Sequence, residues 1–415
     1  MRHNSLSMTT RVRHTSALAA GSAVSGLLAY VFFAVVTRAL GSTAAAPVSV
    51  LWAYWSFAGA ALTFPLQHWI ARSVSAHGGE RSVREPLPGI ALVSLVVAIV
   101  AAGASWTVRD LLFDSGAPWF PLLVGAVTLG AAVMGMVRGM LTARGRFAAL
   151  GVGLVAENGV RCVAAAALMA AGVDNPVAYG GCLLAGYVAA SIWPSTFRLA
   201  DTGSRGDGRS PLVFLGGTAG GQTIGQVVLT GGPVVLALAG GSAADVTALF
   251  AGLALFRAPY TLALGLVASL TGWFTRLVVE RREDHLRRIR RWLVLAAVVG
   301  SAGAAVVGAL LGPVLMPLIF GHDIKLSSGL TLVLAVGSTI AMANLVATLL
   351  VLAHGRTPGL VRSWLLALLP GVVWFAVGGA SALDRTCWAF LVVEAAAFCL
   401  LLREEARGTG LLAAA

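Results

Sequence analysis

The sequence predicts an all-α polytopic membrane protein with about twelve transmembrane helices in two six-helix lobes. Its composition is 58% hydrophobic and only 11% charged, which is more apolar than the core of a soluble domain of this size requires. The apolar residues also form runs of about 20, the length at which a helix crosses about 30 Å of hydrocarbon. Positively charged residues separate these runs in a regular way, which is the third observation.

The expected spans divide evenly around one polar segment. The first six are 16–37, 47–70, 87–108, 119–142, 148–172 and 177–197, and the second six are 212–239, 245–273, 292–316, 326–353, 359–381 and 386–402. The turn-rich linker at 201–211, DTGSRGDGRSP, therefore separates an N-terminal lobe, 1–200, from a C-terminal lobe, 212–415. The similar segments FAGAAL (57–62) and FAGLAL (250–255), each followed by a proline, suggest two parallel repeats.

The basic residues give the orientation of the chain. With the N-terminus inside, 23 of the 29 Lys and Arg residues fall in inside segments and four fall in outside loops. The other two, Arg161 and Arg257, lie within spans. Both termini are therefore expected in the cytoplasm, with the protein in the cell (plasma) membrane. The run from Arg281 to Trp292, RREDHLRRIRRW, is expected to lie against anionic headgroups on the cytoplasmic side.

Composition and motifs favour a protein that is not an enzyme. The net charge of +12 is dispersed over short loops, so nucleic acid is not an expected partner. The four cysteines have no metal-ligand spacing, and the chain contains no phosphate-binding GxxxxGK[ST] loop. We therefore expect no catalytic residue, no metal and no cofactor.

Four ionisable residues interrupt the apolar spans, although each charge at mid-bilayer costs about 2.5 to 3.5 kcal/mol on insertion scales. Glu157 and Arg161 occupy one face of span five, one turn apart, whereas Arg257 lies in span eight and Glu394 in span twelve. Their similar depth predicts a water-filled cavity between the lobes, with Arg161 and Arg257 as substrate-binding residues. The carboxylates are candidates for lining the cavity or for coupling. A purely structural pair that neutralises itself remains the alternative for Glu157 and Arg161.

Span seven carries the glycine-rich segment GGTAGGQTIGQ, residues 216–226. Its small-xxx-small spacing is typical of closely packed helices in membranes. A flexible gate, with Gln222 and Gln226 toward a polar cavity, is the functional alternative.

Several short motifs resemble one transporter superfamily. They are VVTRALG (35–41), FPLQHWIARSV (64–74), ARGRF (143–147), AENGVRC (156–162), GGPVVLALAGG (231–241), LFRAPYTLALGLVASL (255–270) and VLMPLIFGHD (314–323). The chain resembles the oligosaccharide-lipid and polysaccharide flippases of the multidrug/oligosaccharidyl-lipid/polysaccharide (MOP) exporter superfamily. The resemblance implies two six-helix lobes and movement of polyprenyl-diphosphate-linked sugars from the inner to the outer leaflet. It also implies a cavity lined by cationic residues, a role that passes here to Arg161 and Arg257, although the chain has a single lysine, Lys325.

The leading hypothesis is therefore a flippase for an anionic polyprenyl-diphosphate-linked oligosaccharide or a related polysaccharide precursor. Its expected partners are that glycan lipid, membrane lipids, and a polysaccharide polymerase or glycosyltransferases of the same pathway. A cation-coupled multidrug exporter is the main alternative, but that class usually has acidic residues in span one or seven. Neither 16–37 nor 212–239 contains one. A non-transporting envelope assembly protein is the third hypothesis.

Overall fold

The computed structural model describes residues 3–113, 119–204, 224–264, 267–378 and 381–414. Every regular element in these ranges is helical. Eight described helices are long and apolar enough to cross a membrane: Ala20–Ala44, Leu87–Thr107, Trp119–Ala143, Phe147–Ala170, Glu283–Phe320, Ser328–Ala353, Thr357–Val377 and Ala382–Thr409. These correspond to the expected spans one, three, four, five and nine to twelve.

The other four expected spans are less regular. The segment 47–70 contains a π-helical turn, Gly59–Thr63, which ends two residues before Pro65. The segment 177–197 passes from an α-helix into 3-10 turns, and 245–273 is covered by two helices, whereas 212–239 lies partly outside the described residues. Hydropathy reports how far a segment is apolar, but proline and local packing decide whether its backbone stays α-helical.

The chain divides into two compact units. The N-terminal unit comprises 1–40 with 50–220, and the C-terminal unit comprises 41–49 with 221–415. The long first helix, α1 (His3–Ala44), has a left-handed residue at Gly41, with φ 73°. A neighbouring amide, that of Ser42, donates to Oδ2 of Asp323 at 2.6 Å within the C-terminal unit.

The N-terminal unit is built around α7. Its helices after α1 are α2 (Ala46–Ala58), α3 (Phe64–His77), α4 (Arg81–Arg84), α5 (Leu87–Thr107), α6 (Arg109–Phe113), α7 (Trp119–Ala143), α8 (Phe147–Ala170) and α9 (Pro176–Ala185). Helix α7 packs against α3, α5 and α9. In the most apolar stretch of α7, 56% of the residues are buried, whereas the corresponding value for α5 is 17%. This identifies α7 as the central helix and α5 as a peripheral one.

Glycines on α7 allow α3 to approach closely. A Cβ atom on Gly139 would lie 2.9 Å from the Cβ of Ile70, and one on Gly135 would lie 2.9 Å from the Cβ of Leu66. The pair has the GxxxG spacing that places two small residues on one helix face. A close contact of small residues therefore also forms on span four, where the sequence had not indicated it. Most of the predicted segment in span seven, 216–226, lies outside the described residues.

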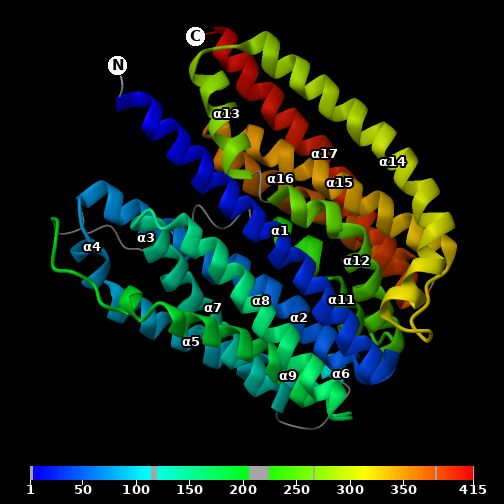
Figure 1. The fold of residues 1–415 in the computed structure, drawn as a ribbon. Coiled ribbons are helices and arrows are strands. Elements are labelled where there is room, and N and C mark those ends of the chain that lie inside the picture. Colours follow the sequence, from blue (N-terminus) through cyan, green and yellow to red (C-terminus); the bar gives the residue numbers. More distant parts are fainter. Residues whose placement is uncertain (1–2, 114–118, 205–223, 265–266, 379–380, 415) are drawn as a thin grey trace. The chain divides into compact units, whose positions relative to one another are not determined.

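The C-terminal unit is built around α15. Its helices are α11 (Gly232–Leu238), α12 (Ala243–Leu264), α13 (Val267–Val279), α14 (Glu283–Phe320), α15 (Ser328–Ala353), α16 (Thr357–Val377) and α17 (Ala382–Ala414). Helix α15 packs against α14, α17 and α12, and α17 packs against α16 (Figure 1). In the most apolar stretch of α15, 61% of the residues are buried, whereas the corresponding value for α14 is 11%. Most of α14 therefore presents its apolar side chains outward.

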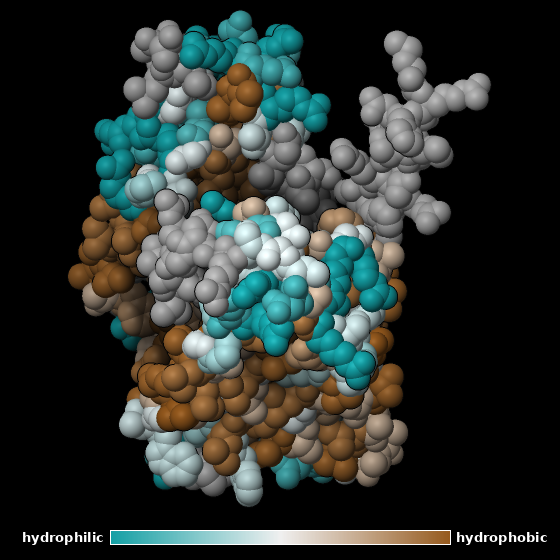
Figure 2. All heavy atoms as spheres, turned by 90° about the vertical axis from the view of Figure 1, so that its left-hand side faces the viewer, coloured by the Kyte–Doolittle hydropathy of each residue, from teal (hydrophilic) through white to brown (hydrophobic). Residues whose placement is uncertain are grey.

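Large apolar side chains are exposed on both units. Val96 and Val100 of α5 and Val298 and Leu310 of α14 are examples. On the face shown in Figure 2, hydrophobic side chains cover most of the lower part, whereas hydrophilic ones gather toward the upper part. Helices that are apolar on their outer faces are suited to contact with lipid rather than water.

A polar clasp joins three segments at one end of the N-terminal unit. Glu80, before α4, accepts two hydrogen bonds from the Arg144 guanidinium, at 2.8 and 3.0 Å, and one from the Ala200 amide at 2.8 Å. Arg144 also donates to the carbonyl oxygen atoms of Ser195 and Arg198. The hydrogen bonds from Arg144 lower the pKa of the Glu80 carboxyl below its ordinary value, although partial burial opposes them.

We expect this clasp to make stability depend on pH in the acid range. A carboxyl with a lowered pKa stabilises the fold fully above its ordinary pKa of 4.5, and that stability is lost as the pH falls through the lower folded value. Glu80→Gln should therefore reduce stability by about 1.5 to 3 kcal/mol at neutral pH. The stability of this variant should also fall less steeply than that of the wild type as the pH is lowered. Thermal midpoints at a series of pH values measure both effects. Glu85→Gln, at an exposed ion pair with Arg81, is the control and should change little.

The close approach of α7 and α3 predicts a large effect of Gly139→Val. The added methyl groups would meet Ile70 and the Gln67 backbone, and overpacking of this kind costs about 1 to 3 kcal/mol. Gly103→Val is the matched control, because nothing lies within 4 Å of a Cβ at Gly103. Thermal midpoints of the purified variants test the contact. Equal midpoints for the two variants would contradict the packing of α7 on α3.

Candidate functional site

The N-terminal unit contains a buried group of charged residues, which we call the N-terminal charge cluster: Arg138, Glu157, Asn158 and Arg161. Glu157 accepts from Arg161 Nη2 at 2.6 Å through Oε1 and from Arg138 Nη2 at 2.5 Å through Oε2. Arg161 also donates to Asn158 Oδ1 at 2.9 Å and to the Leu183 carbonyl at 3.1 Å. Glu157 and Arg161, which the sequence places one turn apart on one helix face, therefore form an ion pair, and one carboxylate contacts two guanidinium groups.

Aromatic rings and a glycine surround the Arg161 guanidinium. Its central carbon lies 4.4 Å from the centre of the Trp55 ring and 5.5 Å from that of Tyr187. Cation–π contacts of this kind stabilise a charged group that is buried away from water. A Cβ on Gly186 would lie 2.4 Å from Arg161 Nε, so no larger residue fits there. Arg161 is 0% exposed and its three nitrogen atoms all donate to protein groups.

Arg138 is the more accessible cation of this cluster. Its side chain is 12% exposed, compared with 0% for Arg161. Its buried Nε atom has no hydrogen-bond partner among the described residues. The assignment of basic residues to inside and outside loops had placed Arg138 in an inside loop. The residue instead lies within α7. Its position inside the expected span 119–142 was the signal that could have identified it.

Asn158 extends the N-terminal charge cluster to α1. Its side-chain nitrogen donates to Ser25 Oγ at 2.7 Å. Cys162, one residue after Arg161, also contacts α1, because its thiol lies 3.0 Å from the Leu28 carbonyl. Helices α1, α7 and α8 and the 3-10 segment that begins at Gly186 therefore all contribute to one polar core.

The C-terminal unit contains a second buried group, the C-terminal charge cluster: Arg257, Tyr260, Asn344, Phe390 and Glu394. Asn344 donates to Glu394 Oε2 at 2.7 Å and to its carbonyl oxygen at 2.9 Å. The Arg257 guanidinium lies 5.8 Å from the centre of the Phe390 ring. Arg257, Tyr260 and Glu394 also interact electrostatically with one another.

Glu394 is the acidic residue of this cluster. It is 1% exposed, and its Oε1 atom has no hydrogen-bond partner among the described residues. A buried carboxylate oxygen without a partner is costly. Asn344, which donates to its carboxylate, was not predicted, because an amide in an apolar run does not stand out in the sequence. Asn344 comes from α15 and Glu394 from α17, so only packing brings them together.

The remaining predicted residues are less informative. Gln222 lies outside the described residues. Gln226 is half-buried, and its backbone carbonyl accepts a hydrogen bond from the Thr230 hydroxyl. Within the described part of the chain, no group of three or more His, Cys, Asp or Glu side chains could hold a metal ion. The roles of Arg161, Arg257, Glu157 and Glu394 in transport stay predictions.

Sequence comparisons identify no relative of the chain. No family model matches it, and no curated protein matches it either. Solved structures, in contrast, match along nearly the whole length.

One such structure is the inward-facing conformation of a multidrug resistance MATE family transporter of the MOP superfamily. It is 14% identical, with 94% of this chain and 95% of that chain covered and a TM-score of 0.68. The chain has a MATE-like fold. A second structure, described as MATE in complex with MaL6, is 16% identical, with 97% of this chain and 96% of that chain covered and a TM-score of 0.63.

A third structure of the same fold is a MOP superfamily transporter from Pyrococcus furiosus Vc1. It is 15% identical, with 97% of this chain and 95% of that chain covered and a TM-score of 0.60. It is described as having a binding pocket of reverse polarity that suggests a different function. The MATE-like fold is therefore shared, whereas identities this low carry no substrate from one protein to another.

The shared carboxylate predicts that charge removals in the N-terminal charge cluster are not additive. Glu157→Gln leaves two buried guanidinium groups without an anion and should cost about 3 to 5 kcal/mol. Adding Arg161→Gln removes one of those charges, so the double variant should be at least as stable as Glu157→Gln alone. Thermal midpoints of both single variants and the double variant form the cycle. Asp174→Asn, at an exposed loop residue, is the control, and additive losses would contradict the shared carboxylate.

Proposed function

We propose that the protein is a membrane transporter that moves an anionic polyprenyl-diphosphate-linked oligosaccharide, or a related polysaccharide precursor, from the inner to the outer leaflet. The MATE-like fold supports transport in general. The excess of arginine in the buried clusters is the observation that favours an anionic substrate. Three arginines, Arg138, Arg161 and Arg257, face two carboxylates there.

Arginine suits this substrate because of its chemistry. A guanidinium group is planar, stays protonated in a poorly hydrated site and binds phosphate oxygens through two parallel hydrogen bonds. Within the N-terminal charge cluster, Arg138 is the residue best placed to accept such a ligand, because its side chain is partly exposed and its Nε atom is unpaired among described residues. Each nitrogen atom of Arg161 already donates to a protein group and the side chain is 0% exposed, so we assign it to holding Glu157 and the aromatic walls in place.

In the C-terminal unit, Arg257 is the proposed head-group ligand. Its Phe390 contact is a cation–π interaction at 5.8 Å, which is weaker than a bidentate ion pair. A diphosphate would bind this guanidinium through two parallel, charge-assisted hydrogen bonds. Glu394 and Glu157 remain candidates for coupling, with Gln222 and Gln226 as further cavity residues.

A cation-coupled multidrug exporter is the second candidate, and the names of the MATE structures favour it. Export of a cationic drug requires buried acids to hold the drug or the coupling ion. In this chain the expected first and seventh spans, 16–37 and 212–239, contain no Asp or Glu. The reverse polarity described for the Pyrococcus furiosus transporter supports the view that pocket charge varies among proteins of this fold.

The mechanism that we propose is alternating access, in which residues 1–200 rock against residues 211–415 in the cell membrane. A polysaccharide polymerase or glycosyltransferases of the same pathway would supply or remove the glycan lipid. The interior of a cell is electrically negative, so outward movement of an anionic lipid is downhill by about 2.3 kcal/mol per charge per 100 mV. Transport of this kind requires no ATP.

Reconstituted vesicles and a fluorescent polyprenyl-diphosphate oligosaccharide test the proposal. Wild-type protein should move the lipid between leaflets without nucleotide, and faster when the receiving side is positive. Arg257→Ala should slow movement roughly tenfold to a hundredfold, the range for a lost charge-assisted hydrogen bond. Arg257→Lys should restore only part of the rate, because an ammonium lacks the planar fork.

Arg276→Ala is the matched control, because Arg276 is an exposed arginine of the same unit. Full movement by Arg257→Ala would refute the head-group role of Arg257. Strict dependence on ATP would refute the mechanism. Gradient-driven export of a cationic drug, without lipid movement, would support the multidrug alternative, and neither activity would support an envelope assembly protein.

A further inference from the structure

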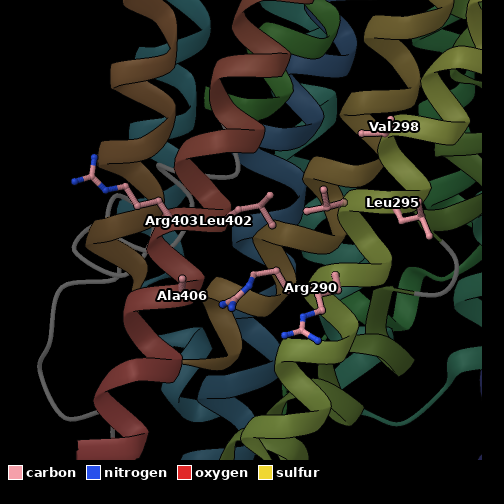
Figure 3. A pocket seen from close by; sticks show the side chains of 8 residues that line it. Arg290, Leu295, Val298, Leu402, Arg403 and Ala406 are labelled. Atoms are coloured by element: carbon pink, nitrogen blue, oxygen red, sulfur yellow. The ribbon is translucent and has the colours of Figure 1, made fainter.

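A groove lies between α14 and α17 of the C-terminal unit, away from the buried clusters. Its volume is about 640 Å³. Arg290 lies at one end, and Leu295 and Val298 of α14 and Leu402 of α17 lie toward the other (Figure 3). Arg291, the next residue after Arg290, also lines the groove. A groove with a cationic end and apolar walls fits a ligand that is anionic at one end and apolar at the other.

The sequence of α14 places this groove at the boundary between lipid head groups and hydrocarbon. Residues 281–291 include six arginines, whereas the residues after Trp292 are apolar for several turns. Trp292 is 64% exposed, and exposed tryptophans concentrate at the membrane interface. The arginines therefore lie at head-group level, and Val298 lies at the level of the acyl chains.

The charges at the cationic end of the groove are only partly neutralised by the protein. Arg290 donates to Glu405 at 2.9 Å, and the Glu405 side chain is 0% exposed. Arg291 and Arg403 make no ion pair with any residue that the structure describes, and both are exposed. Arg403 lines the rim, and its side chain extends away from α14 in Figure 3. Arg291 therefore gives this end of the groove surplus positive charge, and Arg403 adds a second cation at the rim beside α17.

We propose that this groove binds one anionic phospholipid of the adjacent leaflet. The phosphate lies against Arg290 and Arg291, and an acyl chain follows the apolar walls between α14 and α17. The charge surplus selects a lipid with net negative charge over a zwitterionic one. The apolar walls select a lipid over a free phosphate, because an acyl chain buries their surface.

The bound lipid also joins two helices that make few direct contacts here. Helix α14 packs mainly on α15, and α17 packs on α15 and α16. A lipid that spans the groove therefore adds contacts across α14 and α17, and it should raise the thermal midpoint of the protein.

The test uses full-length protein that has been stripped of lipid in detergent. Native mass spectrometry and thermal midpoints are recorded during titration with phosphatidylglycerol, and with phosphatidylcholine of the same chain length. We expect one phosphatidylglycerol to be retained and to raise the midpoint. Arg291→Gln with Arg403→Gln should weaken retention roughly thirtyfold, the change expected for two interfacial arginines.

The matched control is Arg288→Gln with Arg407→Gln, which removes the same charge from the same two helices outside the groove. It should retain the lipid like the wild type. Ala406→Phe fills the groove without changing charge and should also abolish retention. Equal retention of the two lipids, equal loss in the control, or unchanged retention in both groove variants would each overturn the proposal. Retention of inorganic phosphate alone, with the same midpoint shift, would also overturn it.

Discussion

The carboxylate of Glu157 is the feature on which the interior of the N-terminal unit depends. It is 1% exposed and receives guanidinium groups from two helices. An unpaired charge in such a place costs several kcal/mol more than a lost apolar contact. The helices that supply Arg138 and Arg161 must therefore stay in register.

The packing around Glu157 follows from this requirement. Gly186 has no side chain because the Arg161 guanidinium occupies the space. Similarly, a Cβ on Gly130 would lie 2.1 Å from the Tyr187 ring, which faces Arg161. Small residues in α7 and in the 3-10 segment thus make room for one large cation and the aromatic rings that cover it.

The C-terminal unit buries charge in a different way, and this difference gives the two units different chemistry. Glu394 is held by the Asn344 amide, whereas Arg257 rests near an aromatic ring. Near the C-terminal end of α17 the arrangement is different. There three arginines, Arg356, Arg362 and Arg407, form ion pairs with the buried carboxylate of Glu404. Arginines therefore neutralise a buried acid in each unit, Glu157 in the N-terminal unit and Glu404 in the C-terminal unit.

The sequence by itself determined the membrane-protein class, most of the helices and the one-turn spacing that places Glu157 beside Arg161. Hydropathy and the one-turn spacing within a helix are local properties, so they can be read along the chain. Only the tertiary structure decided that Arg138 completes the N-terminal cluster, that Asn344 holds Glu394 and that Gly139 admits α3. These contacts join residues that are far apart in sequence, and they depend on which helix faces pack together.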